Sequence, residues 1–454
     1  MKPSFFYCFI LAFLLMTSNK AFAYDIAVEN DDGVIIYYNY YNNGTELEVT
    51  YKTDANSYLG SVNIPETVTY MNRTRSVTSI GNYAFHWCSN LTNVAIPSSV
   101  TSIGQKAFYD CTGLTSVTIP SSVTSIGQKA FYNCSCTSIK VSVVDMATFC
   151  NNQVIGQIES VINLPVTLID SEGNVITGYV IPEGVETIGA DAFRRCTGLN
   201  SVTILEGVTS IGSSAFWGCT ALTTVTIPSS VTSIDVAAFE GCLGLKKVIV
   251  SDIAAWCGIS FVLFSSNPLH FAHHLYSDKY TEIKGLVIPS GVTSIGYDAF
   301  DGCTGLTSVT IPSSVTSIGQ KAFYNCSGLT SVTIPLSVTS IGDHAFSGNN
   351  NLTTVISLRE EPFSIPDDTF SQDVFMNADL FIPVGTMDKY KSKAGWKNFL
   401  WMQEGTPSGI STTASEMDAE KDRYTIDGKR ITEPSRGLNI IRMSDGTTKK
   451  FIVK

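Results

Sequence analysis

Apolar and polar residues alternate along most of the chain in a pattern that has a 23-residue period. In a typical unit, residues 114–136, the stretch 114–119 alternates apolar residues with Ser and Thr, which predicts a short strand. Pro120 ends that strand, because proline has no N–H to donate to a sheet. A second extended stretch, residues 123–126, stops at Gly127, and the turn that follows carries Phe131.

A fixed period of this length predicts a solenoid, in which each coil buries its apolar side against its neighbours. We therefore predict a β-rich leucine-rich-repeat solenoid with 23-residue coils, parallel strands and short helical turns, and a small C-terminal β domain. About 13 coils would be stacked at roughly 4.8 Å. Ladders of Phe, Ile, Val and Cys are expected inside. The phenylalanines that mark the period are Phe85, Phe108, Phe131, Phe193, Phe216, Phe239, Phe300, Phe323 and Phe346.

The repeats are grouped in threes, and the three groups begin with the coils of Phe85, Phe193 and Phe300. An insertion follows each of the first two groups, near residues 139–179 and 248–286, and each reads as a longer coil with a protruding arm. The expected organisation is a signal peptide at 1–23, an N-terminal β cap at 24–60, the solenoid at 61–358, a C-terminal cap at 359–404, a linker at 405–420 and a β-rich tail at 421–454.

The start of the chain has the features of a secretory signal peptide. Lys2 precedes an apolar run from Phe5 to Met16, and Ala21-Phe22-Ala23 matches an A-x-A cleavage site. The run is too short to span a membrane, and no later stretch is long enough either. The alternative is an N-terminal anchor that is not cleaved.

Composition and charge narrow the possible partners. The chain has 29 basic and 40 acidic residues, a net charge of −11, and only 15% charged residues. Such a mildly acidic, hydroxyl-rich surface is poorly suited to nucleic acid or anionic lipid, so neither a nucleic-acid partner nor a membrane span is expected.

Twelve cysteines in an exported chain would ordinarily suggest disulfides. Here most of them follow the 23-residue period, and at Asn349 the same position holds asparagine. This spacing favours buried free thiols, which pack as small apolar residues. Disulfides between stacked coils remain the alternative, and Cys136 alone lies off the pattern.

The best candidate for metal chemistry is the triple-histidine stretch of His270, His273 and His274. The equivalent stretch in the preceding insertion has Val166 and Thr167 in place of the last two histidines. A metal needed by the fold would be kept in both copies, so no metal or cofactor is predicted. The chain also contains no G-x-S-x-G, H-E-x-x-H or phosphate-binding glycine motif, so we do not predict an enzyme.

Hydroxyl side chains recur on the outer positions of the predicted strands. They could form a polar binding face, or reflect only the preference of threonine for exposed strand positions. A third hypothesis is an ice-binding array. The candidate binding residues are Thr115, Ser116, Thr118, Thr223, Thr224, Thr226, Thr307, Ser308, Thr310, Thr330, Ser331 and Thr333.

The units at 114–135 and 306–327 resemble the leucine-rich repeats of BspA-like bacterial surface proteins. The resemblance covers roughly residues 62–358. It implies a surface or secreted adhesin that binds host matrix proteins or other bacteria. The tail carries Asp427-Gly428-Lys429-Arg430 and Gly437-Leu438-Asn439-Ile440, which resemble a type IX secretion sorting domain. An ordinary small β cap is the alternative for the tail.

The sequence thus predicts a non-catalytic exported or cell-surface adhesin that presents an elongated leucine-rich-repeat surface to protein partners. The alternative is a glycan-binding surface module, which would need exposed aromatic side chains. The insertions offer four aromatic candidates for such a surface: Phe261, Phe264, Phe271 and Tyr276.

Overall fold

The protein is a β-solenoid of about 13 coils, as the 23-residue period predicts. The computed structural model describes residues 23–52, 57–136, 138–144, 149–150 and 165–405, together with the backbone of four strands between 420 and 453. The expected signal peptide and linker, at residues 1–23 and 405–420, lie almost wholly outside the described residues.

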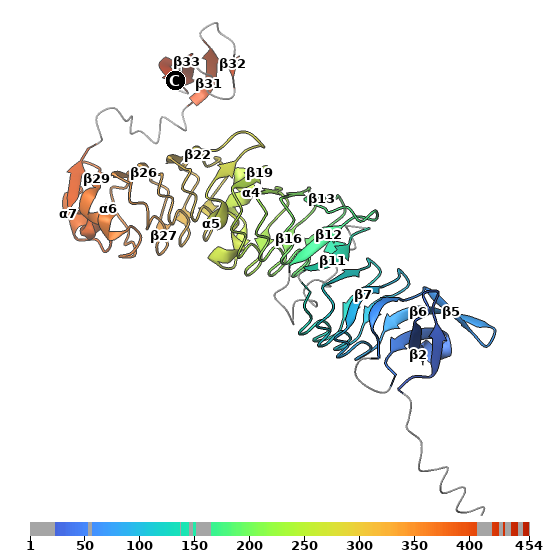
Figure 1. Cartoon of the computed structure of the whole chain (residues 1–454). Helices are drawn as coiled ribbons and strands as arrows, with labels where there is room; N and C mark the ends of the chain where they lie inside the picture. The colour runs from blue at the N-terminus through green and yellow to red at the C-terminus, as the bar shows by residue number, and fades with distance from the viewer. Residues whose placement is uncertain are drawn as a thin grey trace, which may run out of the picture. The chain divides into compact units, whose positions relative to one another are not determined.

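The chain folds as two compact units, which we describe separately (Figure 1). The first unit contains residues 1–179, 188–199 and 215–220. The second unit contains residues 180–187, 200–214 and 221–454.

The first unit opens with antiparallel strands that lead into a parallel stack. Strand β1 (Ile26–Glu29) pairs with β2 (Ile35–Tyr41), and the 3-10 turn η1 (Asn42–Gly44) joins β2 to β3 (Glu46–Thr50). Strand β3 then pairs in parallel with β6 (Arg73–Ile80), which forms a hairpin with β5 (Thr67–Tyr70). The sequences Asp31-Asp32-Gly33 and Asn42-Asn43-Gly44 form the connections between these strands.

The described coils of the first unit contribute longer strands, and two of the coils also contribute a shorter strand. The longer strands are β4 (Gly60–Asn63), β7 (Leu91–Ala95), β9 (Ser116–Ile119), β11 (Ser138–Ser142) and β12 (Val166–Ile169). The shorter ones are β8 (Ser102–Ile103) and β10 (Ser125–Ile126), which extend the sheet of β6 in parallel.

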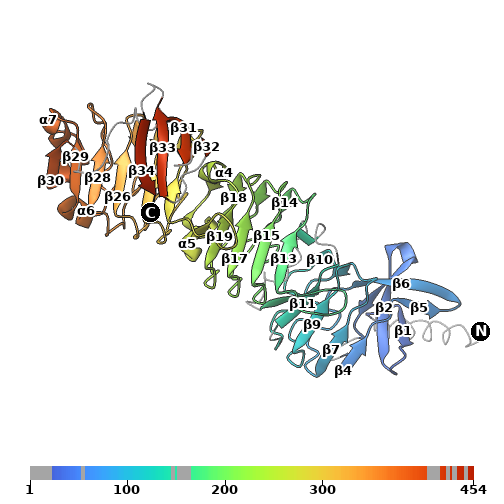
Figure 2. The same ribbon diagram turned by 90° about the horizontal axis from the view of Figure 1, so that it is seen from above.

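The second unit repeats this arrangement, and Figure 2 shows its longer strands side by side. The longer strands are β13 (Gly178–Ile181), β15 (Ser201–Ile204), β17 (Thr224–Ile227), β19 (Lys247–Val250), β21 (Leu275–Tyr276), β22 (Gly285–Val287), β24 (Ser308–Thr310), β26 (Ser331–Ile334) and β28 (Thr354–Ser357). The shorter strands are β14 (Thr187–Ile188), β16 (Ser210–Ile211), β18 (Ser233–Ile234), β20 (Ser260–Phe261), β23 (Ser294–Ile295), β25 (Ser317–Ile318) and β27 (Ser340–Ile341).

Short helices occur where the repeat is interrupted. The insertion near residues 248–286 contains α4 (Ile253–Cys257), η2 (Phe264–Ser266) and α5 (Leu269–Ala272). The segment expected to be the C-terminal cap contains α6 (Gln372–Asn377), α7 (Met387–Lys391) and η3 (Trp396–Asn398). This segment also adds two parallel strands to the sheet of β28, namely β29 (Asp379–Ile382) and β30 (Trp401–Glu404). Leu380 and Ile382 continue the buried row, a short alternation that the sequence analysis did not take as a strand.

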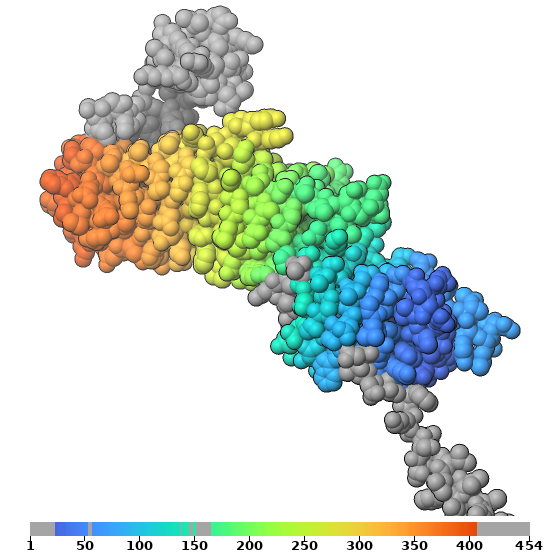
Figure 3. Space-filling view, viewed as in Figure 1, coloured from blue at the N-terminus to red at the C-terminus, as the bar shows by residue number. Residues whose placement is uncertain are grey.

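Phenylalanine rings stack through the interior of both units. Phe85, Phe108 and Phe131 lie 5.0 Å apart between ring centroids, with interplanar angles of 2° and 6°. Phe300, Phe323 and Phe346 form the same stack in the second unit, at 5.2 and 5.3 Å. All of these side chains are buried, so the predicted phenylalanine ladder is confirmed. Figure 3 shows the surface that encloses these stacks.

The periodic cysteines act as hydrogen-bond donors between coils. Sγ of Cys134 donates to the Phe108 carbonyl oxygen at 2.9 Å, and Sγ of Cys326 donates to that of Phe300 at 3.0 Å. Nδ2 of Asn349 makes the equivalent bond to Phe323 at 2.9 Å, which explains why asparagine can replace cysteine there. The eleven described cysteines form no disulfide, and Cys136 is also buried, with Sγ 3.2 Å from the Leu114 carbonyl oxygen.

The C-terminal tail forms a separate antiparallel sheet of four strands in its described backbone. In spatial order these are β32 (Arg430–Ile431), β31 (Glu420–Thr425), β33 (Gly437–Met443) and β34 (Thr448–Val453). The predicted hairpin turns at Asp427-Gly428 and Asp445-Gly446 lie outside the described residues.

Replacing Phe323 with Ala should lower the free energy of unfolding by about 3–5 kcal/mol, because it opens a cavity between two stacked rings. Hydrogen exchange should rise in the coils on both sides, since neighbouring coils share their stability. The control is Tyr324→Ala. The Tyr324 side chain is only partly buried, so this variant should lose much less free energy of unfolding. Equal losses in the two variants would contradict the assigned core.

Candidate functional site

The predicted hydroxyl residues lie on the outer side of the longer strands. In β9, β17, β24 and β26 the valine side chains point inward and are buried, while the Ser and Thr between them are exposed or half-buried. Thr115, Thr223, Thr307 and Thr330 directly precede these strands.

The structure brings only some of these residues together. Strands β24 and β26 pair in parallel through Val309 and Val332, so Ser308 and Thr310 lie beside Ser331 and Thr333. Strand β17 belongs to another sheet of the second unit, where Thr224 and Thr226 pair with Ser201 and Thr203 of β15. Ser116 and Thr118 belong to the first unit.

Hydroxyls on and just before the shorter strands join coils. Within the second unit, Oγ1 of Thr232 donates to the Thr209 carbonyl oxygen at 3.1 Å, and Thr339 donates to Thr316 at the same distance. Serines at the preceding turn do likewise, as Ser230 does to Val208 at 2.7 Å. These side chains therefore have a structural role.

Most hydroxyls on the longer strands are not used in this way. Thr223 and Thr307 donate to carbonyl oxygens of the preceding coil at 2.9 and 3.1 Å. The hydroxyls within the strands make no side-chain hydrogen bond to any described residue; these are Ser116, Thr118, Thr224, Thr226, Ser308, Thr310, Ser331 and Thr333. We call the six of these in the second unit the hydroxyl face.

One arm of the second unit begins beside strand β19. Nζ of Lys247, on the outer side of β19, lies 4.6 Å from the Tyr276 ring centroid and donates to the Lys279 carbonyl oxygen at 3.2 Å. The Asp278 carboxylate accepts the amides of Tyr280 and Thr281 at 2.7 and 2.9 Å, which shapes the tip. Tyr280 is 83% exposed there. Sequence analysis did not single out Lys247 or Tyr280, although Lys247 pairs in register with Thr224 of the preceding coil.

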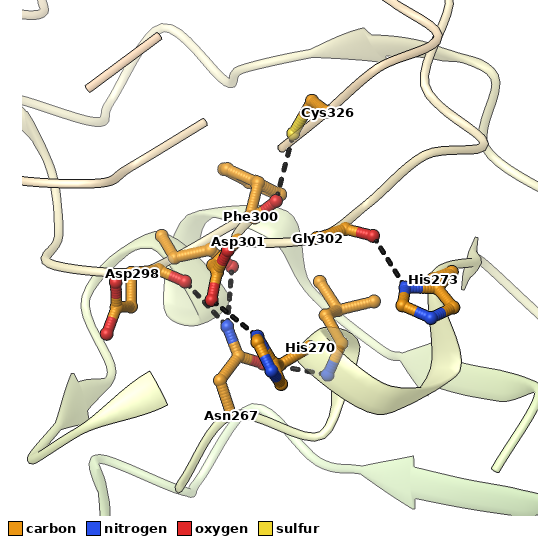
Figure 4. Close-up of polar contacts among 10 residues, drawn as sticks. Asn267, His270, His273, Asp298, Phe300, Asp301, Gly302 and Cys326 are labelled. Carbon is orange, nitrogen blue, oxygen red and sulfur yellow. Dashed lines mark hydrogen bonds and ion pairs between the residues drawn. The ribbon is translucent and has the colours of Figure 1, made fainter. Parts of the chain in front are cut away.

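The three histidines near α5 each contact a different oxygen, and Figure 4 shows the contacts of His270 and His273. Nδ1 of His270 lies 2.8 Å from Oδ2 of Asp301, and Nδ1 of His273 donates to the Gly302 carbonyl oxygen at 3.0 Å. Nδ1 of His274 lies 2.6 Å from Oε1 of Glu282. Within the described residues, no cluster of three or more His, Cys, Asp or Glu side chains is placed to hold a metal ion.

Helix α5 covers two acidic residues that flank Phe300. Asp298 and Asp301 are both buried, and neither oxygen of Asp298 has a hydrogen-bond partner within the described part of the chain. Burial, and then the nearby Asp301, raise the pKa of Asp298 to about 6, against the smaller opposing effects of Tyr297, Lys321 and His270. In the equivalent coil of the first unit, Asp191 instead forms an ion pair with Arg194 at 3.0 Å.

The aromatic candidates of the insertion do not form one exposed surface. Phe261 is buried, Phe271 and Tyr276 are partly buried, and Phe264 is exposed. The Phe264 ring packs against His270 at 4.9 Å between centroids.

A family model for the BspA type leucine-rich repeat region matches residues 78–169, 172–265 and 274–388, which is more than half of the chain. This protein belongs to the BspA type leucine-rich repeat family. The resemblance inferred from the repeats is thereby confirmed, and the family match spans the coils that carry the hydroxyl face. No curated protein sequence is significantly similar to the chain.

Several solved structures of bacterial leucine-rich repeat proteins are similar to the chain. A leucine rich cell surface protein of Faecalibacterium prausnitzii is 25% identical over 85% of this chain and 96% of its own, with a TM-score of 0.43. A leucine-rich repeat protein of Bacteroides ovatus is 21% identical over 84% of this chain and 100% of its own, with a TM-score of 0.46. The pneumococcal vaccine antigen PcpA is 15% identical over 85% of this chain and 100% of its own, with a TM-score of 0.28.

None of the helices in the described part of the chain is both long and apolar enough to cross a membrane.

Asp298 should make the stability of the protein depend on pH. Its pKa is about 6 in the folded state and about 3.9 when unfolded, so the folded state favours the protonated form. The free energy of unfolding should therefore fall as pH rises from about 4 through 6. The Asp298→Asn variant has a neutral side chain at every pH. Its free energy of unfolding should therefore exceed that of the wild type by on the order of 1–3 kcal/mol at pH 7, and by little at pH 4.

Urea unfolding of both proteins at the two pH values measures this difference. The control is Asp343→Asn, which changes a carboxylate at a turn that α5 does not cover and should give no such gain. A variant that is less stable than the wild type at both pH values would show that Asp298 is held by its charge.

Proposed function

We propose that this protein is a non-catalytic, exported adhesin that binds a protein partner through the hydroxyl face of its second unit. The observation that carries the proposal is the difference between its two kinds of hydroxyl. The threonines that directly precede a strand, such as Thr232 and Thr339, bond to the neighbouring coil, whereas the hydroxyls within β17, β24 and β26 have no partner among the described residues. Donors and acceptors that the fold does not use are available to a ligand.

The position of the arm supports a protein partner. Lys247 holds the base of the arm at the level of β19, and Tyr280 at the tip is largely exposed. Tyrosine is enriched among the residues that dominate binding energy at protein interfaces. A neutral, hydroxyl-rich sheet with an exposed tyrosine beside it suits a polar protein surface better than a charged polymer.

Location outside the cytoplasm is part of the same proposal. The pattern of residues 1–23 supports export, and the family resemblance supports a secreted or outer-surface protein that contacts host matrix or other bacterial cells. The alternative, a glycan-binding surface module, is favoured by residues of the first unit rather than by the hydroxyl face.

Replacing Thr226 and Thr333 together with Ala tests the hydroxyl face. Binding to a panel of purified extracellular matrix proteins, measured by surface plasmon resonance, should weaken by about ten-fold, because two intermolecular hydrogen bonds are lost. The melting temperature should not change, since neither hydroxyl bonds to a described residue.

The matched control is the double variant Thr232→Ala and Thr339→Ala, at the residues that directly precede the shorter strands β18 and β27. It removes two bonds between coils, so it should lower the free energy of unfolding by about 1–3 kcal/mol and leave binding unchanged. The proposal fails if the wild type binds no matrix protein, or if both double variants bind equally well.

We also propose that the tail at residues 421–454 is a sorting domain for type IX secretion. Its own four-stranded sheet and its Asp427-Gly428-Lys429-Arg430 sequence support this role. Deleting residues 421–454 in a Bacteroidetes-type host should leave the solenoid folded but retain it in the periplasm. Cell fractionation measures this outcome. If the tail is a cap instead, the deletion should lower the melting temperature, and surface display of the folded, shortened protein would reject the sorting role.

A further inference from the structure

Exposed aromatic and lysine side chains gather on one edge of the first unit, away from the longer strands. They come from the turns around Phe85, Phe108 and Phe131, in three successive coils. Trp87 is 51% exposed, Tyr132 is 40% exposed and Tyr83 is 36% exposed. We call this set the aromatic–lysine patch; it consists of Tyr83, Trp87, Lys106, Tyr109, Lys129 and Tyr132.

The side chains of the patch hold one another in place. Nζ of Lys106 lies 5.5 Å from the Tyr83 ring centroid and 5.3 Å from that of Tyr109. Nζ of Lys129 lies 5.5 Å from the Tyr132 ring centroid. The rings of Tyr109 and Tyr132 stack at 5.2 Å with an interplanar angle of 14°. Cation–π contacts and stacking therefore order these side chains before any ligand arrives, which reduces the entropy lost on binding.

The backbone at Trp87 and Tyr83 is unfavourable for such large residues. Their φ angles are +58° and +61°, in the left-handed region that L residues with bulky side chains rarely adopt. Most other coils place residues suited to this conformation at the position of Trp87, and one coil places Arg195 there; the suited residues are Asp110, Asn133, Gly218, Gly241, Gly302, Asn325 and Gly348. A half-exposed tryptophan in a strained position contributes little to the core, so its presence points to a role at the surface.

We propose that the aromatic–lysine patch binds an acidic polysaccharide. Sugar rings would pack on the exposed parts of Trp87 and Tyr83, since aromatic side chains offer an apolar face with a polar edge. Sugar carboxylates would pair with the ammonium groups of Lys106 and Lys129. Nε1 of Trp87 donates to Oδ2 of Asp110 at 2.8 Å, which fixes the orientation of the indole.

The spacing of the patch supports an extended chain of sugars. Successive coils are 5.0 Å apart between the rings of Phe85 and Phe108, and again between those of Phe108 and Phe131. This step is comparable with the length of one pyranose ring along an extended glycan, so each coil can meet one sugar. The two lysines also form a local cationic site on a chain whose net charge is −11, which favours an anionic ligand.

In the second unit, the Lys321–Tyr324 pair provides a matched control for the Lys129–Tyr132 pair of the patch. Nζ of Lys321 lies 5.5 Å from the Tyr324 ring centroid, as Lys129 does from Tyr132. This pair has Asn325 where the patch has Trp87, and it has no second lysine in the next coil, where His344 takes that position. It therefore reproduces the cation–π contact without the rest of the patch.

Binding of the purified protein to polygalacturonate, compared with neutral dextran, tests the proposal by isothermal titration calorimetry. The wild type should bind only polygalacturonate, and more weakly at about 1 M salt, where charges are screened beyond about 3 Å. Trp87→Asn should weaken binding by about ten-fold and raise the melting temperature, because asparagine tolerates the left-handed backbone. Lys106→Glu with Lys129→Glu should abolish binding, whereas Lys321→Glu should not change it.

Other results would overturn the proposal in distinct ways. A wild type that binds neither polymer, or binds dextran equally well, excludes a site for acidic polysaccharide. A Trp87→Asn variant that is less stable and binds normally would show that Trp87 serves the fold. The patch and the hydroxyl face are formed by different strands and turns. A variant that no longer binds the polysaccharide can therefore still be tested for binding to matrix proteins.

Discussion

The structure depends on the hydrogen bonds that each phenylalanine turn makes with the next coil. The Phe108 amide donates to the Ala130 carbonyl oxygen at 2.7 Å, and the Phe108 carbonyl oxygen accepts from Sγ of Cys134. A buried backbone group without a partner costs about as much as a lost hydrogen bond, so every coil must supply the same donor at the same position. This requirement keeps the length of the repeat constant and allows either cysteine, as at Cys326, or asparagine, as at Asn349, to be the donor. Burial also raises the pKa of the Cys326 thiol, which keeps its proton available for donation.

Strict requirements inside the coil leave the outer positions free to vary. Just before the shorter strands the outer hydroxyls still stabilise the stack, because Thr232 and Thr339 bond to the coil before them. On the longer strands the backbone ladder alone joins the coils, and the side chains of Thr226 and Thr333 are not needed for it. The same residue types thus have different roles on the two strands, and only the structure separates the roles.

Much of the fold could be predicted because the 23-residue period and the burial of side chains have the same physical cause, the packing of each coil against the next. Phe323, Cys326 and the alternating strand residues all face inward because each coil must cover the next. The burial of Asp298 could not be predicted, since it depends on where the insertion places α5. Strand β29 was missed because a longer segment that contains helix α6 separates it from β28 and interrupts the period. The left-handed conformation at Trp87 has a weak sequence signal, namely Gly, Asn or Asp at the same position of most other coils.

Chemically distinct sites occur in this solenoid at two kinds of turn: a turn that an insertion covers, and an uncovered turn that carries an unusual residue. In a regular coil the turn residues around phenylalanine lie at the surface, and an ionisable group there remains hydrated, as Lys106 and Lys321 do. Where α5 covers such a turn, both carboxyl groups are buried: the raised pKa of Asp298 favours its protonated form, and Asp301 contacts His270. In the aromatic–lysine patch the coil is regular, and it is the residue type that departs from the local preference. A solenoid can thus acquire new properties in two ways, by covering a standard turn or by placing an unsuited residue on an uncovered one, and neither disturbs the stack of phenylalanines inside.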